Sequence, residues 1–495
     1  MKDQNDMRLL GWIAAAAMGW GLLAQIGWAE QTKAEQANTY DLQPRRQIDQ
    51  TDRVTVQLEV EGILVISDDP KHARPKMKVS AQTVYDERLL ELDPKTHCPA
   101  RSARYYHTAE AAIQIEQETI RPQLRPEHRW IVAQAAPAQV HLFSAKGALT
   151  REELDLIDLL GNTLVLDRLL PTQPVDQKAS WQPTEQTLAI LLGLDKVSQA
   201  DVHCKPSSLS ERSILVEISG TVQGVSGGGQ SAMVLKGKYR VDRATGRINW
   251  FGLAVAERRS PGPVLRGVDI VAKLSVQITP ASEAPQLSEQ LLRDLPLQAD
   301  EQRLLLAYQP PGGGWQILHP RSWHVNREEG QTAVLGLFEE DQWVAQGTFT
   351  LLAPLPQGQD VSLEQFQQEI QQALGKNFGQ FMQAGQYPAP ENQRMYRVVV
   401  QGKVLGQVQN KPVEVPMCWH YYRLADAKGR QAVCAFSMEA DQEERLGQAD
   451  KALVESFRFL DQPTPPEHPT PAGAKDQPNP PQPEQPKKAD THPSS

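Results

Sequence analysis

Strict alternation of apolar and polar residues is the feature that most limits how this chain can fold. Over the eleven residues Val268–Ile278, every second side chain is apolar. The same period of two runs through Val54–Val60 and Leu235–Val241. Because successive side chains of a strand point to opposite faces, each run has one buried and one solvated face, which is typical of antiparallel sheet. With a turn at Asp242–Gly246, the strands of Ser213–Thr279 are expected to form one continuous meander.

Four helices are expected between the strands. Thr150 and Glu153 form a capping box, and Gly161 is expected to end the helix that they open. The other three helices are expected over about 184–192, 362–384 and 441–457. Strands of the second half are expected near 303–308, 322–326, 331–338, 342–352, 395–409, 413–424 and 430–438. The order of strands, helix, strands, helix in that half indicates an antiparallel sheet with helices packed against it.

A proline-punctuated stretch divides these patterns into two regions. Pro280, Pro285 and Pro296 lie in polar sequence between the meander and the next expected strand. We therefore predict an α+β protein with two domains. Residues 51–280 are expected to form a curved, half-barrel-like antiparallel sheet with few helices. Residues 281–300 are expected to be a linker. Residues 301–460 are expected to form a smaller α/β/α sandwich with an antiparallel sheet.

The start of the chain has the pattern of an export signal. Lys2 and Arg8 precede the apolar stretch Leu9–Trp28, which ends between the small residues Gly27 and Ala29. This order predicts a secretory signal peptide over residues 1–29. The apolar stretch is also long enough to span a bilayer, so an uncleaved anchor is the alternative. We expect an exported protein of the periplasm or the extracellular space.

Two further segments are expected to lie outside the folded domains. Residues 30–50 are predicted to be flexible. Residues 461–495 hold 11 of the 37 prolines and almost no large apolar residues, so they are predicted to be a disordered tail.

Charge and composition limit the partners. The net charge of −9 is spread along the chain, which argues against nucleic acid, because phosphate backbones require a basic face. Contact with a membrane is expected only through an uncleaved signal. We predict no cofactor.

The four cysteines are predicted to form two disulfides, as an exported protein permits. Cys418 and Cys434 both lie eight residues from Asp426, so a hairpin centred there places them opposite each other. Cys98 and Cys204 are the second predicted pair. Each of these two follows a histidine, which raises zinc binding as an alternative. However, adjacent residues of a strand point to opposite faces, so we predict no metal site there.

No catalytic residue is predicted. Gly224–Gly228 matches G-x-S-x-G, but a strand follows it where a nucleophile elbow requires a helix. Cys418 and His420 share a strand face, yet a disulfide to Cys434 leaves no free thiol for catalysis. Glu339–Asp341 is interpreted as a solvated hairpin tip and not as a cation site.

Two resemblances add to this interpretation. Trp323–Val325 leading into Ala333–Leu337, a long helix, and the ending Leu453–Phe459 resemble the PsbP/LpqN-like superfamily, which implies a mostly non-catalytic envelope or thylakoid-lumen module. The first domain, with Leu149–Asp158 and the Leu169–Pro171 stretch, resembles uncharacterised exported bacterial proteins. Its layout is similar to LolA/LppX-type half-barrels, which bind lipids or lipidated proteins in the curve of the sheet.

We therefore expect a non-catalytic envelope protein that binds a lipid or a lipidated partner in its first domain. The residues expected to line the interior of the sheet are Ile214, Val216, Ile218, Leu235, Tyr239, Ile270 and Leu274. The alternative is an envelope assembly factor that binds other proteins and has no small-molecule ligand. A hydrolase ranks third, because none of the candidate constellations has the required geometry.

Overall fold

The structure is a computed structural model that describes residues 39–461 except 68, 70, 340–341, 357–358, 390–392 and 409–410. The predicted signal peptide, the start of the predicted flexible segment, and the tail beyond Asp461 lie outside the described residues. Glu340 and Asp341, two of the three residues of the acidic hairpin tip, also lie outside them.

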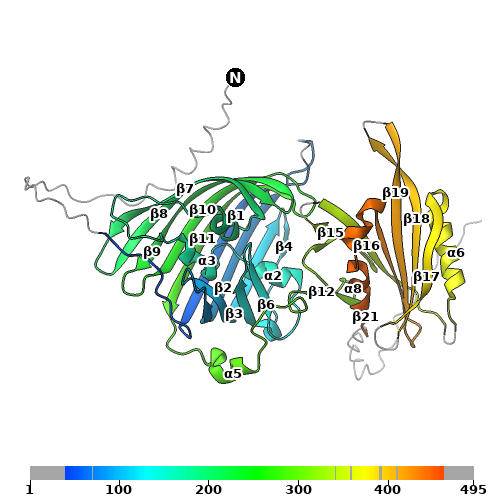
Figure 1. Ribbon diagram of the computed structural model, residues 1–495, viewed down its shortest axis with the longest axis horizontal. Coiled ribbons are helices and arrows are strands. Elements are labelled where there is room, and N and C mark those ends of the chain that lie inside the picture. Colours follow the sequence, from blue (N-terminus) through cyan, green and yellow to red (C-terminus); the bar gives the residue numbers. More distant parts are fainter. Residues whose placement is uncertain are drawn as a thin grey trace, which may run out of the picture.

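The predicted α+β class is wrong, because the chain is predominantly antiparallel β. Strands hold 54% of the described residues and helices only 15%. Two large sheets dominate, and the second region is not a balanced α/β/α sandwich but a broad sheet with short helices (Figure 1). Its long helix, expected over 362–384, ends at Leu374, and residues 378–384 belong to strand β17 (Phe378–Tyr387).

The first region is built on an eleven-stranded sheet with the order β6-β5-β3-β2-β1-β11-β10-β9-β8-β7, and β4 pairs with β3. Its strands are β1 (Thr51–Val65), β2 (Lys76–Leu92), β3 (Pro99–Ile115), β4 (Glu118–Ile120), β5 (Trp130–Ala135), β6 (Val140–Ser144), β7 (Lys196–Leu209), β8 (Ser213–Ser226), β9 (Gly229–Asp242), β10 (Arg247–Arg259) and β11 (Gly267–Pro280). All pairs are antiparallel, and the predicted meander is confirmed as β8 to β11. β1 joins its end, since Leu58 lies opposite Leu274.

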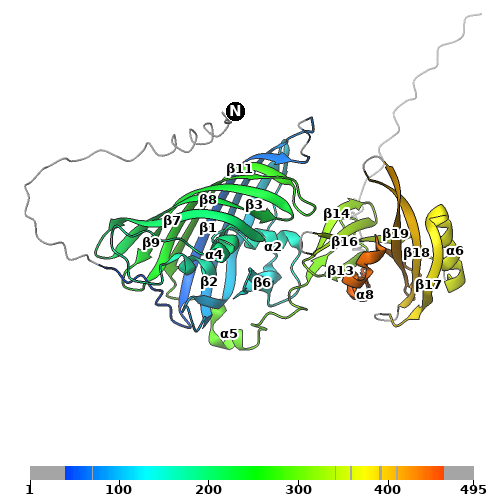
Figure 2. The ribbon, with the colours of Figure 1, turned by 45° about the horizontal axis from the view of Figure 1, so that its top comes forward.

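Short helices lie in the curve of this sheet, as Figures 1 and 2 show. They are α2 (Arg151–Ile157), α3 (Thr163–Leu166) and α4 (Glu185–Leu192). The Thr150 capping box opens α2 as predicted, but the helix ends at Ile157, before Gly161. Gly161 instead has a left-handed φ of 74° and lies against Leu274 of the sheet, where the chain turns into α3.

Buried polar contacts fix α3 to the sheet. The guanidinium of Arg104 on β3 donates to Asn162 Oδ1 at 2.8 Å and to Thr163 Oγ1 at 2.9 Å. The same group forms an ion pair with Glu87 on β2 at 2.8 Å. Every buried charge in this cluster is therefore paired and hydrogen-bonded, as a buried ion requires. The helices thus have a fixed position over one part of the concave face.

The second region contains a seven-stranded sheet with the order β14-β15-β16-β20-β19-β18-β17 and a small sheet with the order β12-β13-β21. The strands are β12 (Leu306–Tyr308), β13 (Trp315–His319), β14 (Trp323–Glu329), β15 (Thr332–Glu339), β16 (Gln342–Leu352), β17 (Phe378–Tyr387), β18 (Arg394–Val408), β19 (Lys411–Ala425), β20 (Gln431–Glu439) and β21 (Arg458–Phe459). The helices are α5 (Glu289–Arg293), which precedes this region, α6 (Leu363–Leu374), α7 (Glu443–Leu446) and α8 (Ala449–Glu455). Single 3-10 turns occur at Pro126–His128, Asp167–Leu169, Pro285–Leu287, Gly375–Asn377 and Ala440–Gln442.

Both faces of the seven-stranded sheet are covered. Phe366 and Ile370 of α6 pack on one face, and Leu453 of α8 packs on the other (Figure 1). On the α8 side, the indole of Trp315 stacks between Phe349 and Phe457, with ring centroids 5.6 and 5.5 Å away. Within the described residues, none of the helices combines the length and the apolar character needed to cross a membrane.

The predicted disulfides are wrong, since all four cysteines are free and buried. In the β19–β20 hairpin, Cys418 lies opposite Met438, and Cys434 lies opposite Tyr422. The hairpin is therefore centred two residues beyond Asp426, and the two thiols are not partners.

The other predicted pair is wrong as well. Cys98 precedes β3, Cys204 lies on the edge strand β7, and six strands stand between β3 and β7 in the sheet order. The alternation of side chains also separates Cys204, which is buried, from His203, which is exposed.

Candidate functional site

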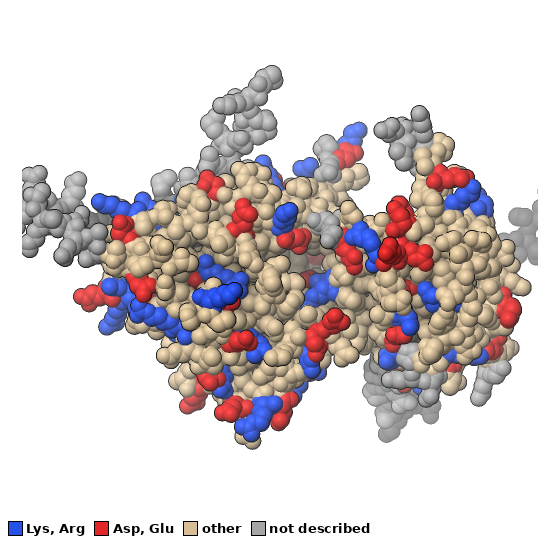
Figure 3. Space-filling view, in the orientation of Figure 1, with Lys and Arg blue, Asp and Glu red and all other residues tan. Residues whose placement is uncertain are grey.

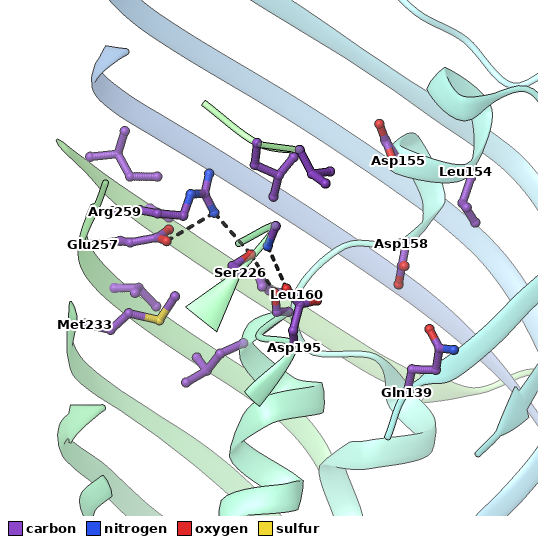
Figure 4. Close-up of a pocket in the computed structure, with 18 of the residues that line it drawn as sticks. Gln139, Leu154, Asp155, Asp158, Leu160, Asp195, Ser226, Met233, Glu257 and Arg259 are labelled. Carbon is purple, nitrogen blue, oxygen red and sulfur yellow. Dashed lines mark hydrogen bonds and ion pairs between the residues drawn. The ribbon is translucent and has the colours of Figure 1, made fainter. Parts of the chain in front are cut away.

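A cavity of about 890 Å³ opens where the concave face of the first sheet meets the beginning of the second region. The helices α2 to α4 cover one part of the concave face, and the cavity lies over the part that they leave free. Figure 4 shows its side chains converging from the sheet and from the loops around α2 and α4.

The floor of the cavity is apolar. Val60 on β1 and Val255 on β10 both lie opposite Ala272 on β11, so three neighbouring strands place apolar side chains in one row. The alternation of each strand directs every second residue to this face. The remaining apolar side chains of the first region that line the cavity are Leu58, Leu154, Leu160, Leu192, Met233, Val264, Leu265 and Ile270.

One wall carries an internally paired charge cluster (Figure 4). The carboxylate of Glu257 accepts from Ser231 Oγ at 2.9 Å and lies 3.3 Å from Arg259 Nη1. Arg259 also approaches Ser226 Oγ at 3.4 Å. Since Glu257 neutralises Arg259, this wall offers polar contacts without a free net charge.

The opposite wall carries two carboxylates that lack such partners. Asp155 and Asp158 come from α2 and its C-terminal end, and both side chains are reached by solvent. Among the described residues, neither carboxylate has a hydrogen-bond or ion-pair partner within bonding distance. The cavity wall desolvates part of both groups, and this raises the pKa of Asp155 to about 6, against the opposing effect of Arg151. The pKa of Asp158 is raised for the same reason, and Arg321 opposes that shift.

The second region supplies the remaining wall, through Arg321, Ser322, His324 and Phe338. Arg321 joins the two regions, because its guanidinium donates to the carbonyls of Leu142 and Leu304, and its own carbonyl accepts from Arg151 at 2.9 Å. Burial and the nearby Arg151 lower the pKa of His324 to about 4, so this side chain is neutral near pH 7.

Of the seven residues expected to line the interior, Ile270 lines the cavity. The other six are buried in the core of the first region, which the helices cover: Ile214, Val216, Ile218, Leu235, Tyr239 and Leu274. Tyr239 shows why this part is filled, since its hydroxyl donates to the carbonyl of Leu169 at 3.2 Å. Whether any of the seven binds a ligand stays a prediction.

Apart from Ser226, which lies in the G-x-S-x-G match, the polar residues of the cavity were missed by sequence reasoning. Glu257 had a usable signal, because it continues the inward series of Phe251 and Val255 at a position where an apolar residue is expected. Asp155 and Asp158 had none, because acidic residues on one side of an amphipathic helix are normally solvated.

The other predicted motifs lie elsewhere or form hairpins. Ser226 of the G-x-S-x-G match ends β8, and β9 begins at Gly229, so another strand comes after the turn. The histidine next to Cys204, His203, pairs with Asp201 at 2.9 Å on the solvent side. In the described part of the chain, the cluster of potential metal ligands is a different one, at Cys418 and His420.

Comparisons with known proteins give no family. No family model matches the sequence, and no curated protein matches it either. The resemblance to the PsbP/LpqN-like superfamily therefore stays a prediction.

Solved structures give distant matches. A protein from Bacteroides thetaiotaomicron is 11% identical over 32% of this chain and 48% of its own, with a TM-score of 0.22. The Saccharomyces cerevisiae Ran-binding protein Mog1p is 9% identical over 32% of this chain and 96% of its own, with a TM-score of 0.24. Lipovitellin, described for its lipid–protein interactions, is 11% identical over 49% of this chain and 26% of its own, with a TM-score of 0.29. All three scores are low, so no conclusion about this chain rests on them.

Proposed function

We propose that the protein is a non-catalytic, exported envelope protein that binds an amphipathic ligand, a lipid or the lipidated segment of a partner, in the cavity of its first region. The observation that carries the proposal is the uncovered apolar floor formed by neighbouring strands β1, β10 and β11. The volume of the cavity, about 890 Å³, is within the range of ligand-binding sites.

The apolar part of the ligand would lie on this floor. Soluble proteins avoid large open apolar surfaces unless something binds there. Leu265 on the rim is 40% exposed although it is apolar, and Ile270 on the floor is only partly buried. Each methylene that the floor takes out of water contributes about 0.8 kcal/mol, so an acyl chain suffices for tight binding.

The polar part of the ligand would lie near Asp155 and Asp158. An ionised carboxylate only accepts hydrogen bonds, and these two are without protein donors among the described residues. They therefore favour a head group that donates, such as an ammonium or a hydroxyl. Eight charged side chains line the cavity, four acidic and four basic, so its net charge does not select an anionic ligand. Figure 3 likewise shows acidic and basic side chains interspersed over the face that it presents.

The proposal is tested on protein purified from its native envelope. Organic extraction followed by mass spectrometry is expected to yield a lipid in near-stoichiometric amount. A neutral fluorescent probe, N-phenylnaphthylamine, is expected to bind the extracted protein and to be displaced by that lipid.

Two neighbouring residues of β11 provide a matched pair of variants. Ile270 lines the cavity, whereas Val271 points to the outer face and is 48% exposed. Ile270→Trp fills the floor and is expected to weaken probe binding by about tenfold or more, which corresponds to about 1.4 kcal/mol. Val271→Trp adds the same side chain outside and is expected to change nothing. Equal binding by both variants, or no lipid and no probe binding at all, would contradict the proposal and favour the assembly factor.

A further inference from the structure

Three potential metal ligands meet in the second region, far along the chain from the residues of the cavity floor. The ligand atoms of Cys418, His420 and Glu443 all lie within 4.8 Å of one another. Cys418 and His420 share one face of β19, because they are two residues apart on a strand. Glu443 begins α7, which follows β20 after the 3-10 turn Ala440–Gln442, and its carboxylate lies beside the other two ligand atoms. The first two side chains are buried and the third is half-buried.

The imidazole of His420 is held in one orientation. Its Nδ1 lies 2.7 Å from Asp450 Oδ2, and the hydroxyl of Tyr422 donates to the same oxygen at 2.6 Å. The guanidinium of Arg397 also lies near Nδ1, but at 3.4 Å, so the shorter contact of Nδ1 is the one to the Asp450 oxygen, which acts as an acceptor. Nδ1 therefore carries the hydrogen, and in the neutral ring Nε2 carries a lone pair.

That lone pair faces the other two groups of the cluster. Nε2 lies 3.4 Å from Oε1 of Glu443, and the thiol of Cys418 belongs to the same cluster. Without a metal, the thiol of Cys418 hydrogen-bonds to the carboxylate of Glu443. A cation bound between the sulfur, Nε2 and the carboxylate would replace that thiol hydrogen as the positive group. A carboxylate that orients a histidine from behind is also the usual outer partner of a metal-binding imidazole.

We propose that Cys418, His420 and Glu443 bind a divalent transition metal of the zinc type. Sulfur, imidazole nitrogen and carboxylate oxygen are the ligand atoms that zinc takes in proteins, at about 2.0 to 2.3 Å. On binding, the Cys418 thiol loses its proton to solvent, and the thiolate and the Glu443 carboxylate together supply two negative charges. These neutralise the dication, so the buried site has no uncompensated charge.

The site has three protein ligands and one open position. The side chain of Glu443 is 40% exposed, so water can reach the metal from that side. Asp450 is not a fourth ligand, because His420, Tyr422 and, at 3.9 Å, Arg397 already surround its carboxylate. The inferred metal thus has a tetrahedral site with water as the fourth ligand.

Cobalt(II) titration of the untagged full chain tests this inference, since Co²⁺ occupies zinc sites and reports its ligands spectroscopically. After treatment with a chelator, one equivalent of Co²⁺ is expected to produce visible d–d bands of a tetrahedral ion and a near-ultraviolet thiolate charge-transfer band. One equivalent of Zn²⁺ is expected to remove both bands.

Two cysteines provide the matched control. Cys418→Ser is expected to abolish the charge-transfer band. Cys434→Ser is expected to preserve it, because Cys434 is buried on the next strand, opposite Tyr422 and outside the cluster. Glu443→Gln keeps the size of a half-exposed side chain and is expected to fold normally, with zinc affinity lowered by at least about tenfold. No stoichiometric binding by the unmodified chain, or an unchanged spectrum in a folded Cys418→Ser variant, overturns the inference.

Discussion

The two regions use broad antiparallel sheets of different width, and they cover them to different extents. The seven-stranded sheet has α6 on one face and α8 with the small sheet on the other, and both layers are filled with apolar side chains. The eleven-stranded sheet is wider, yet of the helices that the structure describes only α2, α3 and α4 enter its concave face, with seven, four and eight residues. The uncovered part of that face forms the cavity. Comparison of the two therefore suggests that the open site arises from the shortage of helix over a wide, curved sheet.

The largest expected difference between the regions is the cost of truncating a side chain. Trp315→Ala removes a fully buried indole that stacks between Phe349 and Phe457, and should lower the free energy of unfolding by about 3–5 kcal/mol. Met233→Ala on the cavity wall should cost less than about 2 kcal/mol, because the side chain already lacks packing atoms on one side. Urea unfolding followed by circular dichroism measures both. Equal costs would show that the cavity wall is packed as tightly as the second core.

Enlarging a side chain should also distinguish the filled core of the second region from the open cavity of the first. Ala345→Leu on β16 adds volume to a filled core and should destabilise the protein by about 1–3 kcal/mol. Ala272→Leu on β11 extends into the cavity and should stay within about 0.5 kcal/mol of the unmodified protein. Thermal unfolding of the two variants side by side is the measurement. A strongly destabilised Ala272→Leu variant would mean that the cavity has no spare room.

The pH dependence of ligand binding should distinguish the acidic wall from ordinary surface carboxylates. With a pKa of about 6, Asp155 is protonated below that pH and ionised above it. The affinity for dodecylamine, which is cationic throughout, should therefore rise from pH 5 to pH 7 by up to about tenfold. Asp155→Asn should reduce this rise, and the remainder should come from Asp158, whose pKa is also raised.

Glu152 is the control, because it is an exposed neighbour on the same helix and does not line the cavity. Glu152→Gln should leave the pH profile unchanged. A flat profile in the unmodified protein would remove Asp155 from the site.

The smallest expected effect is that of a reducing agent, for which we expect no change in either region. Each region holds two free thiols, at Cys98 and Cys204 in the first and at Cys418 and Cys434 in the second. Addition of a reductant should not shift the melting temperature, and alkylation of the unfolded, unreduced chain should modify all four. A peptide linking Cys418 to Cys434 would contradict the register of β19 and β20.

Local patterns in the sequence were sufficient for most strands. The period of two in Val268–Ile278 depends only on which face is buried, and β11 has the expected alternation. The long helix failed because Leu363, Phe366, Ile370 and Leu374 fit a helix that stops at Gly375, where φ is 51°. Helical spacing continues into the next aromatic residues, so the pattern alone could not mark this end.

Tertiary contacts decide the structure of the segment after that helix. β17 pairs closely with β18, and a Cβ atom at Gly379 would meet the carbonyl of Gln401 at 2.7 Å. The glycine is needed because the backbone of a residue 22 positions later in the chain lies against it. A local sequence pattern does not contain this contact. Likewise, the side chain of Asp426 accepts from the backbone of Lys428 and Arg430, so Asp426 opens the hairpin turn and is not its centre. This shift of two residues is enough to separate the predicted disulfide partners.

The cavity could not be predicted for a related reason. The sequence pattern identifies which residues face the inside of the sheet. The same pattern occurs where the inside is filled core and where it is open cavity. Only the extent of the covering helices distinguishes these two cases. Ile270 and Leu274 lie on one strand and one face, yet the first meets the cavity and the second meets Gly161 of the helical layer.

The walls of the cavity come from both regions, with Ile270 and Met233 in the first and His324 and Phe338 in the second. A ligand that fills the cavity therefore contacts both regions at once. Its binding is coupled to the docking of one region on the other. By mass action, a ligand present at 100 times its Kd would stabilise the docked arrangement by about 2.7 kcal/mol over one in which the regions separate and the site is lost. The same coupling acts in the other direction. A partner that binds the second region and separates it from the first would release the ligand without contacting it.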